Sequence, residues 1–272
     1  MPTAGAEPTP LAYVRAGPRT GGPPVVLVHA GVADRRMWDP VWPALTASYD
    51  VVRVDLRGFG ESVQRPDGLL SPVDDLVATI AGLGIARFHL VGASYGAGVA
   101  VETTLAHPSL VASLTLVAPG GSLIAEATDE LRAFVAAESA ALSRGDLPAA
   151  VEANLEWWLA GPHRALDEID PALVAQVRRM QRRAFEITAD WDDVEESEPD
   201  PPALERLDAV EVPTLVVAGG LDVDAITRTA ETLVAGIADA ALVIWPDVAH
   251  LPSMERPADF VATLAERVSP AT

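Results

Sequence analysis

One serine of this chain lies in a pattern that suits nucleophilic catalysis. Ser94 is the centre of GASYG (residues 92–96), which follows the apolar run Phe88 to Val91 and precedes the helical pattern Ala97 to Ala106. A serine in a sharp turn between a strand and a helix has an exposed hydroxyl, and small neighbours are needed because the turn brings backbone segments close together. A glycine-rich turn that merely packs a helix on a sheet would show the same pattern. The catalytic interpretation therefore depends on partners elsewhere in the chain.

The first partner must be a base, because a serine hydroxyl is a poor nucleophile at neutral pH until its proton is removed. His250 lies in PDVAHLP (residues 246–252), a loop between the last β-branched run and the last helical segment. The other histidines lie at strand ends, at a helix end or in a long insert: His29, His89, His107 and His163. The loop position predicts His250 as the base.

The second partner is a carboxylate that fixes the histidine tautomer and stabilises the imidazolium. Asp222 follows the run Thr214 to Ala218 through a short loop, and Asp224 is its nearest rival. Either aspartate could also be a solvated turn residue or a helix N-cap. The chain order Ser, Asp, His favours Asp222 as the third catalytic residue.

Acyl transfer also needs backbone N–H groups that bind the developing oxyanion. Tyr95, directly after the serine, is expected to supply one of them. The small-residue turn after the run Val25 to His29 is expected to supply the other, from Gly31 or, as second choice, from Val32. We also expect Val32 to contact the substrate. An ordinary turn between a strand and a helix would have the same composition.

These residues stand at the ends of short β-branched runs that alternate with longer helical segments, a pattern typical of a mostly parallel sheet. The runs are Val25 to His29, Val51 to Asp55, Phe88 to Val91, Leu114 to Ala118, Thr214 to Ala218 and Leu242 to Trp245. Most are continuously apolar, as expected for central strands that helices cover on both faces. Leu11 to Ala16 is a candidate antiparallel edge strand.

Residues 121–202 break this alternation with an insert that we predict to be an all-helical cap, leaving residues 1–120 and 203–272 as the core domain. Its helices are predicted at Asp129 to Leu142, Leu147 to Leu159 and Pro171 to Ile187. Adjacent Trp157 and Trp158 should point to different helix faces, so that one packs and the other lines a largely apolar substrate pocket. The acidic, proline-bearing segment Asp190 to Pro202 suits a solvated linker.

Four arginines on the last of these helices form a basic cluster: Arg178, Arg179, Arg182 and Arg183. We interpret them as a solvated face balanced by the acidic linker, with a role in holding an anionic substrate as the alternative.

Composition excludes several classes of function. The net charge of −20 disfavours nucleic acid and anionic membranes as partners. The absence of cysteine removes disulfides, thiolate metal sites and a cysteine nucleophile. No apolar stretch is long enough for a membrane helix, and Met1 to Pro10 lacks the features of a signal peptide. We therefore expect a cytoplasmic protein without a metal; a homodimer is compatible with the sequence.

The chain resembles the α/β-hydrolase family, in the branch with a helical cap between the sixth and seventh strands. Besides the serine turn, four segments carry the resemblance: LVHAG (27–31), DLRGFGES (55–62), PTLVVAGGLD (213–222) and AHLPSMERP (249–257). The resemblance implies a doubly wound, mostly parallel sheet of about eight strands and hydrolysis through an acyl-enzyme, with no cofactor. Ala30, Ala97 and Gly220 depart from the usual family residues without removing a catalytic group.

The expected activity is hydrolysis of a carboxylic ester or lactone bond of a small molecule. Ser94 argues against epoxide hydrolases and haloalkane dehalogenases of this fold, which use aspartate as the nucleophile. Carbon–carbon bond hydrolysis and cofactor-free perhydrolase chemistry remain as alternatives. A third alternative, from another class, is a receptor that binds a small molecule without turnover.

Overall fold

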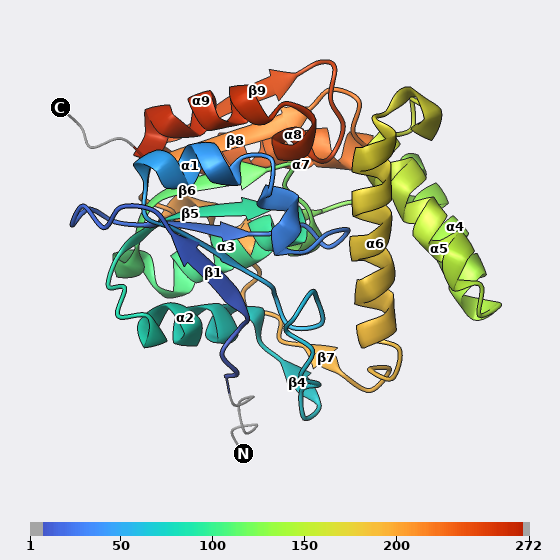
Figure 1. Cartoon of the computed structure of the whole chain (residues 1–272), viewed down its shortest axis with the longest axis horizontal. Coiled ribbons are helices and arrows are strands. Elements are labelled where there is room, and N and C mark those ends of the chain that lie inside the picture. The colour runs from blue at the N-terminus through green and yellow to red at the C-terminus, as the bar shows by residue number, and fades with distance from the viewer. Residues whose placement is uncertain (1–7, 269–272) are drawn as a thin grey trace.

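A seven-stranded sheet forms the centre of the computed structural model, which describes residues 8–268 (Figure 1). The strands are β1 (Tyr13–Ala16), β2 (Val25–Val28), β3 (Val51–Val54), β5 (Phe88–Ala93), β6 (Val111–Val117), β8 (Thr214–Gly219) and β9 (Ala240–Trp245). Their spatial order is β1-β3-β2-β5-β6-β8-β9. All the strands predicted from the sequence are present, with ends that differ by a few residues. Most of the N-terminal segment on which the signal-peptide expectation rests lies outside the described residues.

The sheet is parallel except at one edge, where β1 pairs antiparallel with β3 as predicted. The prediction of eight strands is wrong for the described residues, because the chain before β1 binds a helix instead of forming a further strand. Thr9 N–H donates to Asp75 Oδ1 (2.7 Å), and Leu11 N–H donates to the Thr79 hydroxyl (2.8 Å). Both acceptors lie on α2 (Pro72–Gly82).

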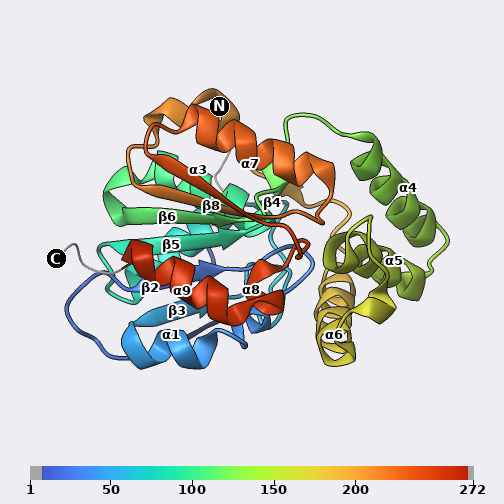
Figure 2. The ribbon, with the colours of Figure 1, turned by 90° about the horizontal axis from the view of Figure 1, so that it is seen from above.

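Side chains alternate between the two faces of each strand, and helices bury both faces. In β2, Val25 and Leu27 pack into one apolar cluster, whereas Val26 and Val28 pack into another. The first cluster lies under α1 (Trp42–Ser48) and α9 (Pro257–Val268); the second lies under α2, α3 (Tyr95–Ala106) and α7 (Asp224–Gly236) (Figures 1 and 2). Each fully buried Val or Leu contributes about 1.5–3 kcal/mol. The helices on both faces hold the strand ends in place.

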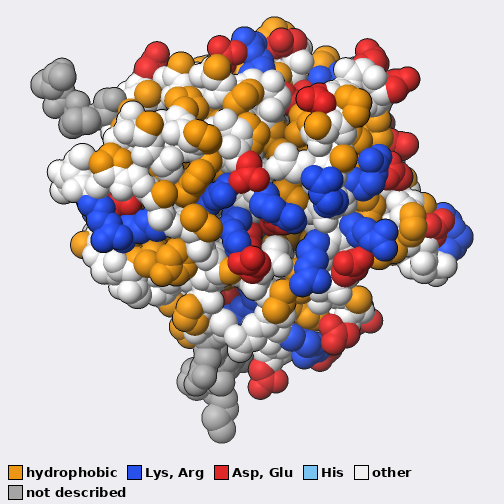
Figure 3. All heavy atoms as spheres, in the orientation of Figure 1, with side chains coloured by type: hydrophobic (Ala, Val, Ile, Leu, Met, Phe, Trp, Pro, Cys, Tyr) orange, Lys and Arg blue, Asp and Glu red, His pale blue; other side chains and the backbone are white. Residues whose placement is uncertain are grey.

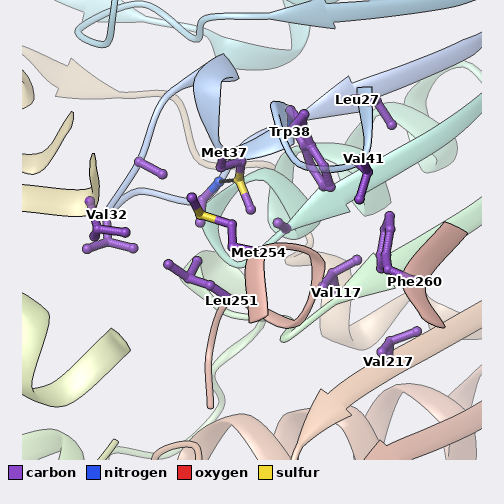
Figure 4. Packing of buried hydrophobic residues seen from close by; sticks show 14 of the residues in the cluster. Leu27, Val32, Met37, Trp38, Val41, Val117, Val217, Leu251, Met254 and Phe260 are labelled. Atoms are coloured by element: carbon purple, nitrogen blue, oxygen red, sulfur yellow. Dashed lines mark hydrogen bonds between the residues drawn. The ribbon is translucent and has the colours of Figure 1, made fainter. Parts of the chain in front are cut away.

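The first cluster is tightly filled around two aromatic side chains. Trp38 and Phe260 are both buried, with ring centroids 5.8 Å apart. Strand residues such as Val117 and Val217 point toward them (Figure 4). Leu251 and Met254 join the same cluster, from the loop after β9 and from the short helix α8 (Pro252–Glu255). The loop that carries His250 is therefore anchored in the core immediately after the histidine.

The insert between β6 and β8 lies beyond the carboxyl ends of the strands (Figure 2). It contains α4 (Asp129–Ser143), α5 (Leu147–Asn154), a π-helical segment (Leu155–Ala160) and α6 (Pro171–Ile187). The helices predicted from the sequence are present, but the second changes from α to π at Leu155. The expectation of an all-helical insert is also wrong at Glu195–Glu196, which forms strand β7 and pairs in parallel with β4 (Leu69–Leu70).

The acidic segment Asp190 to Pro202 contacts the core at several points. Besides the β4–β7 pairing, Arg65 forms an ion pair with Asp193, and Glu196 accepts a hydrogen bond from the Tyr95 hydroxyl (2.8 Å). The segment does not balance the arginines of α6. Arg178 binds Glu152 of α5 (2.5 Å), and Arg182 binds Glu186 of its own helix (2.8 Å). Most residues of the segment are exposed, as expected for a solvated linker, although it also contacts the core. The expectation that it balances the arginines of α6 was wrong.

Candidate active site

Ser94 occupies a strained turn between β5 and α3. Its φ of 51° and ψ of −114° lie in a region that non-glycine residues rarely adopt, at a cost of about 1–3 kcal/mol. The turn is held by the hydrogen bond from Ser94 N–H to the Val117 carbonyl (2.9 Å) and by the Ser94 carbonyl, which accepts from Ala97 N–H (2.8 Å). Strain retained in this way is typical of functional positions.

The glycines at both ends of GASYG are required by close backbone approach. A Cβ on Gly92 would lie 2.2 Å from the Gly96 carbonyl oxygen, and a Cβ on Gly96 would lie 2.5 Å from the His29 carbonyl oxygen. Even alanine would therefore push α3 away from β5 and β2. The two glycines allow the helix to begin directly above the strand ends, which leaves the serine side chain outside the core.

Asp222 and His250 form a hydrogen-bonded pair at the same edge of the sheet. His250 Nδ1 lies 2.7 Å from Asp222 Oδ2, and both residues are buried, with 2% and 4% exposure respectively. Asp222 Oδ1 accepts from Val223 N–H (2.8 Å), so both carboxylate oxygens are oriented. Within residues 8–268, neither His250 Nε2 nor the Ser94 hydroxyl has a hydrogen-bond partner. This arrangement leaves Nε2 available to receive a proton.

The surroundings of Ser94 connect it to the insert. A Cβ placed on Gly120 would lie 3.2 Å from Ser94 Oγ and 3.4 Å from Ile226 Cδ1, so these two groups border one small space. Ile226 belongs to an apolar cluster with Ala118, Val223 and Ala225, against which Trp157 and Trp158 pack. Trp157 and Trp158, both candidate substrate contacts, thus pack on the cluster that reaches the space beside the serine.

Contacts from the insert also hold the histidine, and sequence reasoning missed them. The rings of Trp158 and His250 have centroids 4.5 Å apart, and His250 N–H donates to the Trp158 carbonyl (3.3 Å). Glu255 accepts from Ala249 N–H (3.0 Å) and binds Arg164 of the insert (2.6 Å). Burial raises the pKa of Glu255 more than the Arg164 hydrogen bond lowers it. The sequence signal that could have indicated the role of Glu255 is the segment AHLPSMERP, in which Glu255 follows His250 by five positions.

The candidate oxyanion donors lie side by side. A Cβ on Gly31 would lie 3.5 Å from Tyr95 Cβ, which places the turn after β2 against the start of α3. The backbone N–H groups of Gly31, Val32 and Tyr95 make no hydrogen bond within residues 8–268. Val32 is buried at 5% exposure in the cluster shared with the insert, beside ribbons of that insert (Figure 4). Backbone donors without a protein acceptor at this position suit an oxyanion.

His29 is a structural residue that supports this turn. Its Nδ1 lies 2.9 Å from the Ala30 carbonyl oxygen, and its Nε2 lies 2.9 Å from Leu56 N. Because Nε2 must accept from Leu56 N–H, the ring is neutral, with its proton on Nδ1. Burial lowers the pKa of His29 below the ordinary value, despite the nearby Asp55.

This depressed pKa predicts a loss of stability in mild acid. Above pH 6.5, the ordinary pKa of a histidine, the His29 ring is neutral in both the folded and the unfolded chain. Below that pH the ring is protonated in the unfolded chain but stays neutral in the folded chain, because its folded-state pKa is lower. Between pH 6.5 and 5.5 the wild type should therefore lose up to about 1.0 kcal/mol more than His29→Gln, whose amide oxygen can still accept from Leu56 N–H. Urea unfolding at both pH values measures the difference; equal losses in the two proteins would contradict it.

Comparison with known proteins decides the family. The model of the "Alpha/beta hydrolase family" matches residues 25–263, which include the serine turn, Asp222 and His250. The chain belongs to the α/β-hydrolase family. The fold class predicted from the sequence is thereby confirmed, and so is the assignment as a hydrolase at the level of the family.

Similar proteins include an esterase that matches nearly end to end. A pimeloyl-[acyl-carrier protein] methyl ester esterase of Neisseria meningitidis serogroup B is 29% identical over 241 residues, 88% of this α/β hydrolase and 90% of that protein. The solved structure of a thermophilic esterase from Thermogutta terrifontis is 25% identical, with a TM-score of 0.74 and coverage of 94% and 92%.

A further relative matches only in part. The dihydrolipoyllysine-residue acetyltransferase component of the acetoin cleaving system of Pseudomonas putida is 40% identical over 120 residues. These are 43% of this chain and 32% of that protein, so the match spans about a third of that relative.

None of the helices in residues 8–268 is both long and apolar enough to span a membrane.

Proposed function

We propose that this α/β hydrolase cleaves carboxylic ester or lactone bonds of a small molecule through an acyl-enzyme on Ser94. The observation that carries the proposal is the buried Asp222–His250 hydrogen bond of 2.7 Å at the sheet edge where Ser94 stands in its strained turn. The esterases among its relatives support an ester as the substrate.

The reaction follows from the roles of these groups. His250 Nε2 takes the proton of the Ser94 hydroxyl as Oγ attacks the substrate carbonyl, and Asp222 stabilises the imidazolium. The N–H groups of Gly31 and Tyr95 bind the oxyanion of the tetrahedral intermediate. Collapse breaks the carbon–oxygen bond, and His250 returns its proton to the leaving alcohol. A water molecule, deprotonated by the same histidine, then releases the acid and restores Ser94.

The insert is proposed as the cap, residues 121–202, that shapes the acyl or alcohol pocket. Trp157 and Trp158 pack on the cluster that contains Ile226, which borders the space beside Ser94 Oγ. Val32 is the proposed contact from the core side. Because His250 is almost fully buried under Trp158, the substrate should be enclosed while it reacts.

Removal of one tryptophan should therefore change selectivity for chain length. Trp157→Ala is expected to shift the preference, measured as kcat/KM over p-nitrophenyl esters from acetate to decanoate, toward longer acyl chains because the pocket gains volume. Trp191→Ala is the matched control, since Trp191 lies in the acidic segment against Gly58. An unchanged profile in Trp157→Ala would reject the proposed pocket.

The direct test of the function is wild-type hydrolysis of p-nitrophenyl esters and of lactones, followed through the burst and the steady state. Repeated turnover with release of acid supports the proposal. Binding without turnover would favour the receptor alternative. Cleavage of a coloured dienone, or peroxide-dependent halogenation without esterase activity, would replace the proposal with the carbon–carbon hydrolase or the perhydrolase.

A further inference from the structure

Arginines gather around one cavity outside the candidate active site. A cavity of about 440 Å³ lies between α6, the turn after β3 and the loop after β2. Five arginines line it: Arg35, Arg36, Arg179, Arg182 and Arg183. Four carboxylates line it as well: Asp34, Asp55, Glu61 and Glu186. The lining therefore carries a net charge of +1, in a chain whose net charge is −20. Figure 3 shows the basic side chains facing the viewer across this region, between the core and α6.

The two arginines on the core side are held in place by carboxylates. Arg36 binds Asp34 (2.6 Å); Arg35 binds Glu61 (2.5 Å) and also pairs with Asp55. Burial alone would raise the pKa of Asp34, but the hydrogen bonds from Arg36 outweigh it and hold that pKa below its usual value. Asp34 therefore stays ionised near neutral pH, and on this side of the cavity three carboxylates face two arginines, which are already paired.

Two of the arginines on the α6 side, unlike Arg35 and Arg36, are not paired with carboxylates among the described residues. Arg179 and Arg183 stand one turn apart on α6, and within residues 8–268 neither has a carboxylate within 4.0 Å. Arg182, between them, binds Glu186. Like charges four residues apart destabilise a helix by a few tenths of a kcal/mol, so Arg179 and Arg183 disfavour each other within α6. A guanidinium offers parallel N–H donors that match the oxygens of a carboxylate or a phosphate.

We propose that this cavity binds an oxyanion, a carboxylate or phosphate group of a small molecule, held chiefly by Arg179 and Arg183. Arg35 lies four residues after Gly31, so at most about 14 Å of extended chain separates the cavity lining from the candidate oxyanion turn. The group can belong to the far end of the ester substrate or to a separate anion. In either case it bridges the core and the cap, which Gln176 already joins by donating to the Arg36 carbonyl (2.9 Å).

Binding is tested without turnover. Isothermal titration of the wild type with inorganic phosphate and with glutarate, at constant ionic strength, should show saturable binding that weakens by about tenfold or more in the double variant Arg179→Gln, Arg183→Gln. The matched control is Arg132→Gln, Arg228→Gln, which removes two exposed helical arginines elsewhere and should bind like the wild type. Absence of saturable binding in the wild type, or equal binding in the Arg179/Arg183 variant, overturns the proposal.

A kinetic arm identifies the source of the anion, and only this arm rests on the proposed function. The variants are compared on p-nitrophenyl butyrate and on the p-nitrophenyl monoester of glutaric acid. If the KM of the Arg179/Arg183 variant rises for the charged ester alone, the bound anion is part of the substrate. If both KM values are unchanged while phosphate binding is weakened, the cavity binds a separate anion. Both results support the site. If no ester is hydrolysed, the titration still decides whether the cavity binds anions.

Discussion

Replacement of Ser94 by alanine is expected to reduce ester turnover by about 10³–10⁶-fold and to leave the fold intact. Without Oγ no acyl-enzyme can form, and only the oxyanion donors and substrate binding remain. The fold should persist because the Ser94 hydroxyl makes no hydrogen bond within residues 8–268 and alanine bears the same Cβ at a φ of 51°. Steady-state kinetics, with mass spectrometry of the acylated protein, measures the loss.

Ser253→Ala provides the matched control for this variant. Ser253 lies three residues after His250, and its buried hydroxyl likewise has no hydrogen-bond partner in the described part of the chain. Removal of such a hydroxyl costs little, and the variant should retain both turnover and the covalent adduct. If Ser94→Ala kept turnover within about tenfold of the wild type, Ser94 would not be the nucleophile, and the acyl-enzyme route would be wrong.

The sequence predicted those parts of the fold and site that depend on local patterns. The central strands were visible because a strand covered on both faces is continuously apolar, as Val25 to Val28 illustrate. The Asp222–His250 contact was expected from chain order alone, because the carboxyl ends of neighbouring parallel strands meet at one edge.

Contacts between distant segments were not predictable in the same way. The ring contact between Trp158 and His250 joins positions 92 residues apart, and the Arg164–Glu255 pair joins positions 91 apart. Neither pair leaves a periodic signal in the sequence. The β4–β7 pairing involves two residues on each side, too few for any alternation to show. The arginines of α6 were recognised as a cluster, but their partners depend on how the cap sits on the core.

Asp222→Asn is expected to lower kcat by about 10³–10⁴-fold with little change in KM. An asparagine amide placed toward His250 can no longer accept from Nδ1–H, so the ring would adopt the opposite tautomer and Nε2 would carry a proton instead of receiving one. The structure makes this substitution specific, because Val223 N–H holds the other carboxylate oxygen (2.8 Å) and fixes which atom faces the histidine. Pre-steady-state kinetics should show a slowed acylation step.

Asp224→Asn is the matched control. It shows whether the loss of kcat comes from the contact of Asp222 with His250 or from the removal of any carboxylate in this loop. Asp224 was the rival in the sequence, but its carboxylate pairs with Arg228 (3.3 Å) and its N–H donates to Glu130 of the insert (2.8 Å). Its loss removes a partly exposed i,i+4 pair, worth about 0.3–0.5 kcal/mol of stability, and should leave kcat within a few-fold. A larger loss of kcat in Asp224→Asn than in Asp222→Asn would reverse the assignment. Because Asp222 binds His250 whereas Asp224 pairs with Arg228, the expected order of the two variants follows from the geometry.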